Sequence, residues 1–302
     1  MLFDRLTSRF GIAWLATAVG VPALLALALL VHSSLQPAAA PSTPRPVAPT
    51  DTPSSTPPPV PDETIPAAAP APRNLPVVDY SPAPAGFPAD PRPLSTTPLT
   101  EGVAPARNIA AYDAPGGRPL AFLAPTISGV ELTMPVVERR TGWTAVLLPS
   151  ANRRIAWLPQ GGWTTVALRD QIVVERTPHR LTWYRHGRAL HTWPVSLGMP
   201  GQSTPLGRTF ILGRTEPPEA VYGGVDIFAL GSVPDDPDAV PTGLKGAHIG
   251  LHSWHNDDTL GEDATNGCIR LTRVAQRKLL AEVPAGTALI VVDELPTPPA
   301  TA

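Results

Sequence analysis

The chain of 302 residues has one cysteine, Cys268, so no disulfide can form within it. It has neither paired cysteines nor a His-Glu-x-x-His pattern, which are the spacings typical of many zinc sites. Its formal net charge of −2 gives no electrostatic support to a general nucleic-acid-binding role, so we predict no nucleic-acid partner. Cys268 is therefore a buried structural residue, half of an intermolecular disulfide, or a thiol kept for chemistry.

Long apolar runs are also scarce. The run from Gly11 to Val31 follows Arg5 and Arg9, and at about 20 residues it is long enough to span a bilayer. Because the basic residues precede the run, we expect the N-terminus on the cytoplasmic side. Residues 1–35 are thus predicted to be a cytoplasmic stub and an uncleaved transmembrane signal-anchor. The protein would then be a single-pass cell-membrane protein, with its C-terminal domains outside the cytoplasm.

Cleavage of the N-terminal segment is the alternative, and it would make the protein secreted. Ala38-Ala39-Ala40 is similar to a signal-peptidase site, but Pro41 directly after it argues against cleavage. A soluble buried helix is disfavoured because the run is apolar all round. In either exported case, an unpaired cysteine is unusual outside the cytoplasm and needs a reason.

Proline, by contrast, is abundant. Residues 36–105 hold about half of the 41 prolines, together with many Ala, Thr and Ser residues. Such a stretch buries too little apolar surface to offset the entropy lost on ordering, so we predict a disordered, semi-rigid linker over 36–105. This linker serves either as a stalk that carries the folded domains away from the membrane or as a plain connection. The tail at 296–302 is expected to be loose.

Residues 106–170 contain about five short apolar or alternating runs, separated by turn residues and without a helix pattern. This pattern predicts a small β-barrel. The segments GWTAVLLP and IAWLP, which contain Trp143 and Trp157, resemble an SH3-like module. The two tryptophans either line a ligand groove or fill the small core, and we favour the core.

Residues 171–295 read as a second, mainly β module. Strand patterns cover 172–174, 180–184, 189–195 and 209–213, and a closing strand is expected at 287–292. Between them, apolar residues from Thr272 to Val283 fit a short helix that Pro284 and Gly286 end.

The candidate chemistry lies between Gly246 and Leu271. The first six residues predict a strand with His248, Gly250 and His252 on one face, and a polar loop then leads to Gly267-Cys268. A histidine on a strand and a cysteine just past a loop can meet where the loop closes. The imidazole can then take the thiol proton and leave a nucleophilic thiolate.

At these residues the sequence resembles the L,D-transpeptidase catalytic domain of the YkuD type. The resemblance rests on His252-Ser253, on Thr265-Asn266-Gly267-Cys268 and on Arg270, and it extends to the loop Thr204-Pro205-Leu206-Gly207. It implies a β-sandwich or barrel with a short helix. One departure is plain, because Asn266 stands where the family has a second histidine, and Asn266 cannot take a proton at neutral pH.

The resemblance implies a peptidoglycan L,D-transpeptidase that forms 3→3 cross-links through an acylated Cys268, with His252 as base. The Ser253 carbonyl would orient the imidazole, and Gly267 would leave room for the substrate carbonyl beside oxyanion-binding N–H groups. The implied partners are stem peptides, namely a tetrapeptide donor and a diamino-acid acceptor, and carbapenem-type β-lactams are implied as covalent inhibitors. Neither a cofactor nor a metal is implied.

Six further residues are candidates for substrate binding. Arg270 can bind a substrate carboxylate or brace the cysteine loop, and His248 either supports His252 or belongs to the core. Tyr222 and Trp254 either line the cleft or only pack. Thr265 and Asn266 complete the set, as neighbours of the nucleophile.

Two other functions stay open. A metal-dependent peptidoglycan peptidase would take ligands from His248, His252, His255, Cys268 and the Asp257-Asp258 pair. A catalytically degenerate wall-binding or scaffolding protein would account for Asn266. A papain-like hydrolase is disfavoured because its cysteine precedes its histidine. Within the preferred mechanism, water can replace the amine acceptor.

Overall fold

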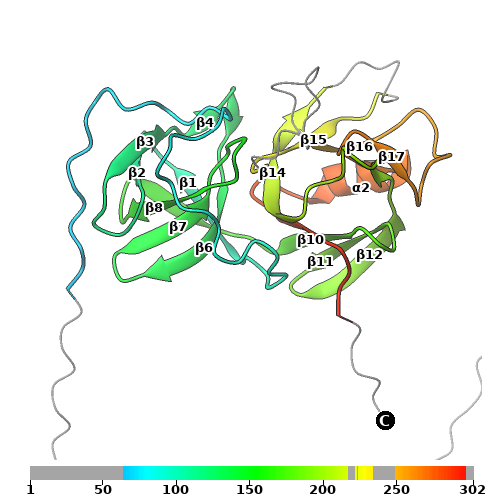
Figure 1. The fold of residues 1–302 in the computed structure, drawn as a ribbon, viewed down its shortest axis with the longest axis horizontal. Coiled ribbons are helices and arrows are strands. Elements are labelled where there is room, and N and C mark those ends of the chain that lie inside the picture. Colours follow the sequence, from blue (N-terminus) through cyan, green and yellow to red (C-terminus); the bar gives the residue numbers. More distant parts are fainter. Residues whose placement is uncertain (1–63, 217–221, 223, 234–248, 297–302) are drawn as a thin grey trace, which may run out of the picture. The chain divides into compact units, whose positions relative to one another are not determined.

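The computed structural model describes residues 64–216, 222, 224–233 and 249–296 (Figure 1). Within these residues the protein is mainly β, with two large sheets and a short helix, α2 (Arg273–Glu282). None of the helices in these ranges is long and apolar enough to cross a membrane. The predicted signal-anchor lies outside the described residues and stays a prediction.

The first sheet is antiparallel and follows the order β3-β2-β8-β7-β6-β1-β9. Its strands are β1 (Glu101–Pro105), β2 (Ile109–Tyr112), β3 (Pro119–Leu123), β6 (Met134–Arg140), β7 (Trp143–Leu147), β8 (Ile155–Pro159) and β9 (Trp163–Ala167), and a small hairpin joins β4 (Thr126–Ile127) to β5 (Val130–Glu131). Within residues 106–170, where about five short strands were expected, the structure has β2, β3, β6, β7, β8 and β9 besides the small hairpin. The SH3-like resemblance stays a prediction.

Both predicted tryptophans fill the core of this sheet. Trp143 and Trp157 are 2% and 4% exposed, and Tyr112 packs edge-on against Trp143 with ring centroids 5.1 Å apart. The indole N–H of Trp143 donates to the carbonyl of Pro66 at 2.8 Å, so its polar atom is satisfied within the protein. These rings are therefore core residues and do not line an open groove.

The prediction of a disordered linker was wrong for residues 64–105. The last part of this stretch forms β1, which pairs with β6 and β9, and the part before it (cyan in Figure 1) is pinned by three isolated bridges. Val78, Tyr80, Phe87 and Leu99 are buried along it. A few well-spaced apolar anchors suffice because proline restricts the unfolded chain and so lowers the entropy lost on ordering. Residues 36–63 lie outside the described residues.

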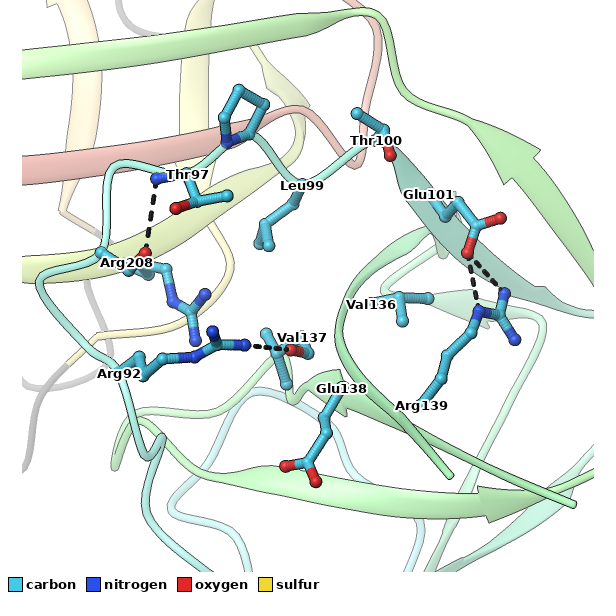
Figure 2. Close-up of a pocket in the computed structure, with 12 residues that line it drawn as sticks. Arg92, Thr97, Leu99, Thr100, Glu101, Val136, Val137, Glu138, Arg139 and Arg208 are labelled. Atoms are coloured by element: carbon cyan, nitrogen blue, oxygen red, sulfur yellow. Dashed lines mark hydrogen bonds and ion pairs between the residues drawn. The ribbon is translucent and has the colours of Figure 1, made fainter. Parts of the chain in front are cut away.

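A buried ion pair anchors this same segment to the second sheet. The Asp90 carboxylate accepts from Nε of Arg208 at 2.7 Å and also from its Nη2, and both side chains are 1% exposed. A cavity of about 420 Å³ adjoins Arg208 (Figure 2), and at its wall Arg139 pairs with Glu101 at 2.7 Å. None of the residues lining it belongs to the predicted active site.

The second sheet follows the order β12-β11-β10-β19-β14-β15-β16-β18. Its strands are β10 (Asp170–Glu175), β11 (Arg180–Arg185), β12 (Arg188–Pro194), β14 (Gly207–Thr215), β15 (Ile227–Leu230), β16 (Gly250–Ser253), β18 (Ile269–Leu271) and β19 (Ala288–Val292), and the short β13 (Leu197–Gly198) pairs with β17 (Asp263–Thr265). The central strands β10 and β19 are parallel and buried along their whole length, as expected of strands covered on both faces.

Helix α2 holds the end of this sheet in place, and it confirms the helix predicted near 272–283. Thr272 caps it by accepting from the N–H of Ala275 at 3.1 Å. Gln276, fully buried, donates from its amide to the carbonyls of Leu251 and Asp226, each at 3.0 Å. The helix therefore fixes β16 directly beside His252.

Candidate active site

Two short parallel strands bring the predicted histidine and cysteine together. In the pairing of β16 with β18, His252 lies opposite Arg270 and Leu251 lies opposite Ile269. Cys268 directly precedes β18, and its Sγ accepts the N–H of Gly250 at 3.4 Å. The thiol is thus held within one strand spacing of the strand that carries His252.

His252 is buried, and its tautomer follows from its partner. Nδ1 lies 2.7 Å from the Ser253 carbonyl oxygen, which can only accept, so Nδ1 carries the proton and Nε2 keeps its lone pair. Burial lowers the pKa of His252 to about 4, and the charge of Arg270 adds to this against the opposing hydrogen bond to Ser253. At neutral pH His252 is therefore an uncharged imidazole that can accept a proton at Nε2.

Cys268 is partly buried, and burial raises the pKa of its thiol. The N–H of Gly250 and the charge of Arg270 act in the opposite direction, but they do not cancel the burial. The resting pair is therefore a neutral thiol beside a neutral imidazole. A thiolate, which the sequence led us to expect, forms only when the proton leaves during attack.

A tight turn presents the thiol. Thr265 Oγ1 donates to the Cys268 carbonyl at 2.6 Å and accepts the N–H of Gly267 at 3.2 Å. Gly267 has a φ of 99°, a conformation that favours glycine, and its own N–H is engaged within the turn. Gly267 and Thr265 thus shape the loop, whereas the Asn266 side chain is exposed at its outer side.

Arg270 lies next to His252 and Cys268, and the described residues leave much of the hydrogen-bonding capacity of its guanidinium unused. Its main chain is held by Ser196 through two hydrogen bonds of 3.0 and 3.1 Å, and its guanidinium stacks 4.1 Å above the centre of the Trp254 ring. Nη1 donates weakly to the Ala264 carbonyl at 3.4 Å. Among the described residues, the buried Nε has no hydrogen-bond partner and the guanidinium has no carboxylate partner.

Aromatic rings cover His252. The ring of Tyr222 is edge-on to His252 at 4.9 Å and to Trp254 at 5.3 Å. The backbone of Tyr222 is tied to the site as well, because its carbonyl accepts from Ser253 Oγ at 3.2 Å. These contacts account for the burial of the imidazole, and they leave the proposed substrate contacts of Tyr222 and Trp254 as predictions.

The structure thus places Cys268, His252, Ser253, Arg270, Tyr222 and Trp254 in one cluster, with Thr265 and Gly267 in the turn that supports it. His248 lies outside the described residues. Within the described part of the chain, no group of three His, Cys, Asp or Glu side chains is placed to hold a metal ion.

Sequence reasoning missed three contributors. Gly250 supplies the N–H that contacts the sulfur, and a glycine inside a predicted strand was the available signal of a close backbone approach. Ser196 holds the Arg270 backbone. Tyr80 is buried, and burial raises the pKa of its phenol, with a charge on Cys268 as the smaller cause. No local pattern indicates either of them, because both contacts join segments far apart in the chain.

This chain is similar in sequence and fold to known L,D-transpeptidases. The family model for the L,D-transpeptidase catalytic domain, YkuD, matches residues 169–292. The protein named YkuD in Bacillus subtilis (strain 168) is 27% identical over 107 residues, which are 35% of this chain and 56% of that protein. The protein of the same name in Bacillus licheniformis is 26% identical over 117 residues, 39% of this chain and 62% of that one. An L,D-transpeptidase structure from Mycobacterium smegmatis has 17% identity and a TM-score of 0.35, covering 53% of this chain and 82% of that one.

This chain therefore spans less than two thirds of the length of either Bacillus relative. The family match begins just before β10 and ends with the last residue of β19, so it contains the whole second sheet, α2 and the Cys268–His252 pair. Residues 169–292 of this chain therefore match the YkuD family model of the L,D-transpeptidase catalytic domain.

Proposed function

We propose that this protein is a peptidoglycan L,D-transpeptidase that forms 3→3 cross-links between stem peptides through a thioester on Cys268. One observation carries the proposal: Ser253 fixes the His252 tautomer, and this leaves an unprotonated Nε2 on the strand next to the only thiol of the chain. The match to the family's catalytic domain supports the reaction class.

In the first half-reaction, Cys268 Sγ attacks the carbonyl carbon of the third residue of a tetrapeptide donor. Its proton passes to Nε2 of His252 as the C–S bond forms, because the thiol is neutral at rest. The tetrahedral intermediate then breaks its C–N bond, and the terminal D-alanine leaves with the proton that His252 returns to its nitrogen. The product is the acyl-enzyme and free D-alanine.

In the second half-reaction, the side-chain amine of a diamino acid in an acceptor stem attacks the thioester. His252 takes the amine proton and returns it to the sulfur as the C–S bond breaks. A neutral base is required in both directions, and the lowered pKa of His252 supplies one at neutral pH. Water attacking in place of the amine would give hydrolysis through the same steps.

Arg270 is suited to bind a carboxylate of the stem peptide. Its guanidinium lies over the Trp254 ring, and among the described residues it has no carboxylate partner. A substrate carboxylate would pair with this charge in a charge-assisted hydrogen bond next to the reacting sulfur. The exposed Asn266 takes no part in proton transfer under this scheme.

The remaining parts of the proposal concern location and inhibition. A signal-anchor in residues 1–35 would tether the enzyme to the cell membrane and place the catalytic domain in the wall or periplasm, where stem peptides occur. Carbapenem-type β-lactams should acylate Cys268 because they present a strained carbonyl to the same nucleophile.

The test is incubation of the full-length protein with a tetrapeptide donor, alone and with an acceptor stem, followed by mass spectrometry of protein and products. We expect an acyl adduct on Cys268, release of D-alanine and, with acceptor, a cross-linked dimer. The Cys268→Ala variant should lose all three while keeping its circular dichroism spectrum. Turnover by Cys268→Ala, or wall binding without any adduct, would contradict the proposal.

A further inference from the structure

The face of the sheet that carries the catalytic pair continues beyond it as a row of small residues. Gly213 on β14 pairs with Ala229 on β15, and Ala229 pairs with Gly250 on β16, whose N–H contacts the sulfur of Cys268. Paired residues point to the same face of a sheet, and His252, two residues after Gly250, shares that face. Ala229 therefore lies about two strand spacings, roughly 10 Å, from Cys268.

A cavity of about 230 Å³ opens over the far end of this row. It is lined by Gly213, Thr215 and Ala229 of the second sheet, by Ser128 and Val130 of the β4–β5 hairpin, and by Tyr80. The hairpin approaches closely here, since a Cβ on Gly213 would lie 2.6 Å from Val130 Cγ1. Pockets that hold a whole drug-sized ligand measure about 300–1,000 Å³, so this one suits part of a longer ligand.

Tyr80 reaches the cavity from outside the matched catalytic domain. It is 8% exposed, and its φ of 81° is a strained backbone conformation for a bulky residue. The backbone around it is fixed by the bridge to Ser150 and by the Ala151 N–H, which donates to the Tyr80 carbonyl at 3.2 Å. Burial raises the pKa of the Tyr80 phenol, and a charge on Cys268, which exists only when the thiol ionises, is the smaller cause, so the phenol stays neutral.

We propose that this cavity is a substrate subsite for the stem peptide, and that Tyr80 and the β4–β5 hairpin determine which peptide it accepts. This inference rests on the proposed function. An extended peptide advances about 3.3–3.6 Å per residue, so a chain that starts at the carbonyl on Cys268 and follows the row of small residues reaches the cavity after about three residues. The occupant is a peptide segment of the donor stem or of the acceptor stem.

Two variants of the full-length protein change the cavity in opposite ways. Thr215→Trp fills it from an exposed position on β14, and Tyr80→Ala removes one wall. Phe87→Ala is the matched control, because it removes another buried aromatic ring from the same segment without touching the cavity. Alkylation of Cys268 by iodoacetamide reports on the thiol itself and needs no peptide subsite.

We expect Thr215→Trp to raise the KM for one stem peptide about tenfold, with alkylation of Cys268 within about twofold of wild type. Tyr80→Ala should also raise that KM, whereas Phe87→Ala should lower Tm as much as Tyr80→Ala does and leave KM unchanged. If the KM for the donor rises in the acylation half-reaction, the cavity binds the donor stem. If only the KM for the acceptor rises in the transfer half-reaction, the cavity binds the acceptor stem.

If Thr215→Trp leaves the KM for both peptides unchanged, the cavity is not a substrate subsite. The same conclusion follows if Phe87→Ala raises the KM as much as Tyr80→Ala does. Failure of the proposed function gives a different result, because wild-type protein would then form no acyl adduct with the donor while iodoacetamide still alkylates Cys268.

Discussion

Two regions of the protein, named here the catalytic wall and the other wall, are built in opposite ways. Residues 249–271 form the catalytic wall, where two parallel strands fix the positions of His252 and Cys268 through backbone pairing. The other wall is the proline-rich segment 64–99, which contributes Tyr80 to the cavity of the proposed subsite and is held by three isolated bridges, a few buried side chains and one ion pair. Strand pairing distributes its stabilisation over many bonds, whereas the proline-rich segment depends on a few anchors. It should therefore open locally at a lower free energy than the catalytic strands.

The largest expected effect is a loss of acylation rate from a substitution in the catalytic wall that leaves the fold intact. His252→Ala removes the base and should slow acylation of Cys268 by the tetrapeptide donor by about 10²–10⁴-fold. His255→Ala is the matched control, because His255 is exposed and contacts only the outer side of this cluster, with its ring 5.2 Å from that of Trp254. Acylation rates from rapid-quench mass spectrometry decide the matter. Equal losses in the two variants would show that His252 is not the base.

The spacing of His252 and Cys268 allowed their juxtaposition in the catalytic wall to be predicted from the sequence. A strand, a polar loop and a second strand bring His252 and Cys268 together, and this order needs no contact with the rest of the chain. Their protonation state was not readable in the same way, because it depends on burial by Tyr222 and Trp254 and on the nearby charge of Arg270. Burial keeps the thiol protonated, against the thiolate that the residue types alone suggested.

The ordered structure of the other wall, residues 64–99, could not be predicted from the sequence. Val78, Tyr80, Phe87 and Leu99 have neither the two-residue nor the 3.6-residue period, so composition dominated and predicted disorder. The partner of Asp90 is Arg208, more than a hundred residues later, and a buried pair at that separation leaves no local signal. The same reason hid Tyr80 from the list of site residues.

Breaking that ion pair should have the second-largest effect. Asp90→Ala leaves the buried Arg208 without its partner and should lower the free energy of unfolding by about 3–5 kcal/mol. In the double variant Asp90→Leu/Arg208→Met an apolar pair replaces the charges and should recover most of this loss. Urea unfolding monitored by tryptophan fluorescence measures both. If the double variant is no more stable than Asp90→Ala, the uncompensated charge is not the cause.

The burial of His252 in the catalytic wall should also make the stability of the protein depend on pH. Burial lowers the pKa of His252 from 6.5 to about 4, so between these values the unfolded chain binds a proton that the folded protein excludes. The stabilisation is fully present above pH 6.5 and is lost as the pH falls to 4, and it amounts to roughly 3 kcal/mol. Thermal unfolding of wild type and His252→Asn across this range tests it. A parallel decline in both proteins would assign the acid sensitivity to other groups.

The smallest effect concerns a single anchor of the proline-rich segment. The Tyr112 hydroxyl donates to the Ala69 carbonyl at 2.7 Å, and Tyr112→Phe removes this bond while keeping the ring against Trp143. The expected loss is about 1 kcal/mol. Because the bond joins the segment to β2, hydrogen exchange should accelerate around Ala69 and not at β16 or β18, and acylation of Cys268 should be unchanged. Tyr184→Phe, on β11 and half-buried, serves as the control. Uniform acceleration in Tyr112→Phe would mean that the segment and the catalytic strands unfold as one unit, and the contrast between the two walls would then be structural without being energetic.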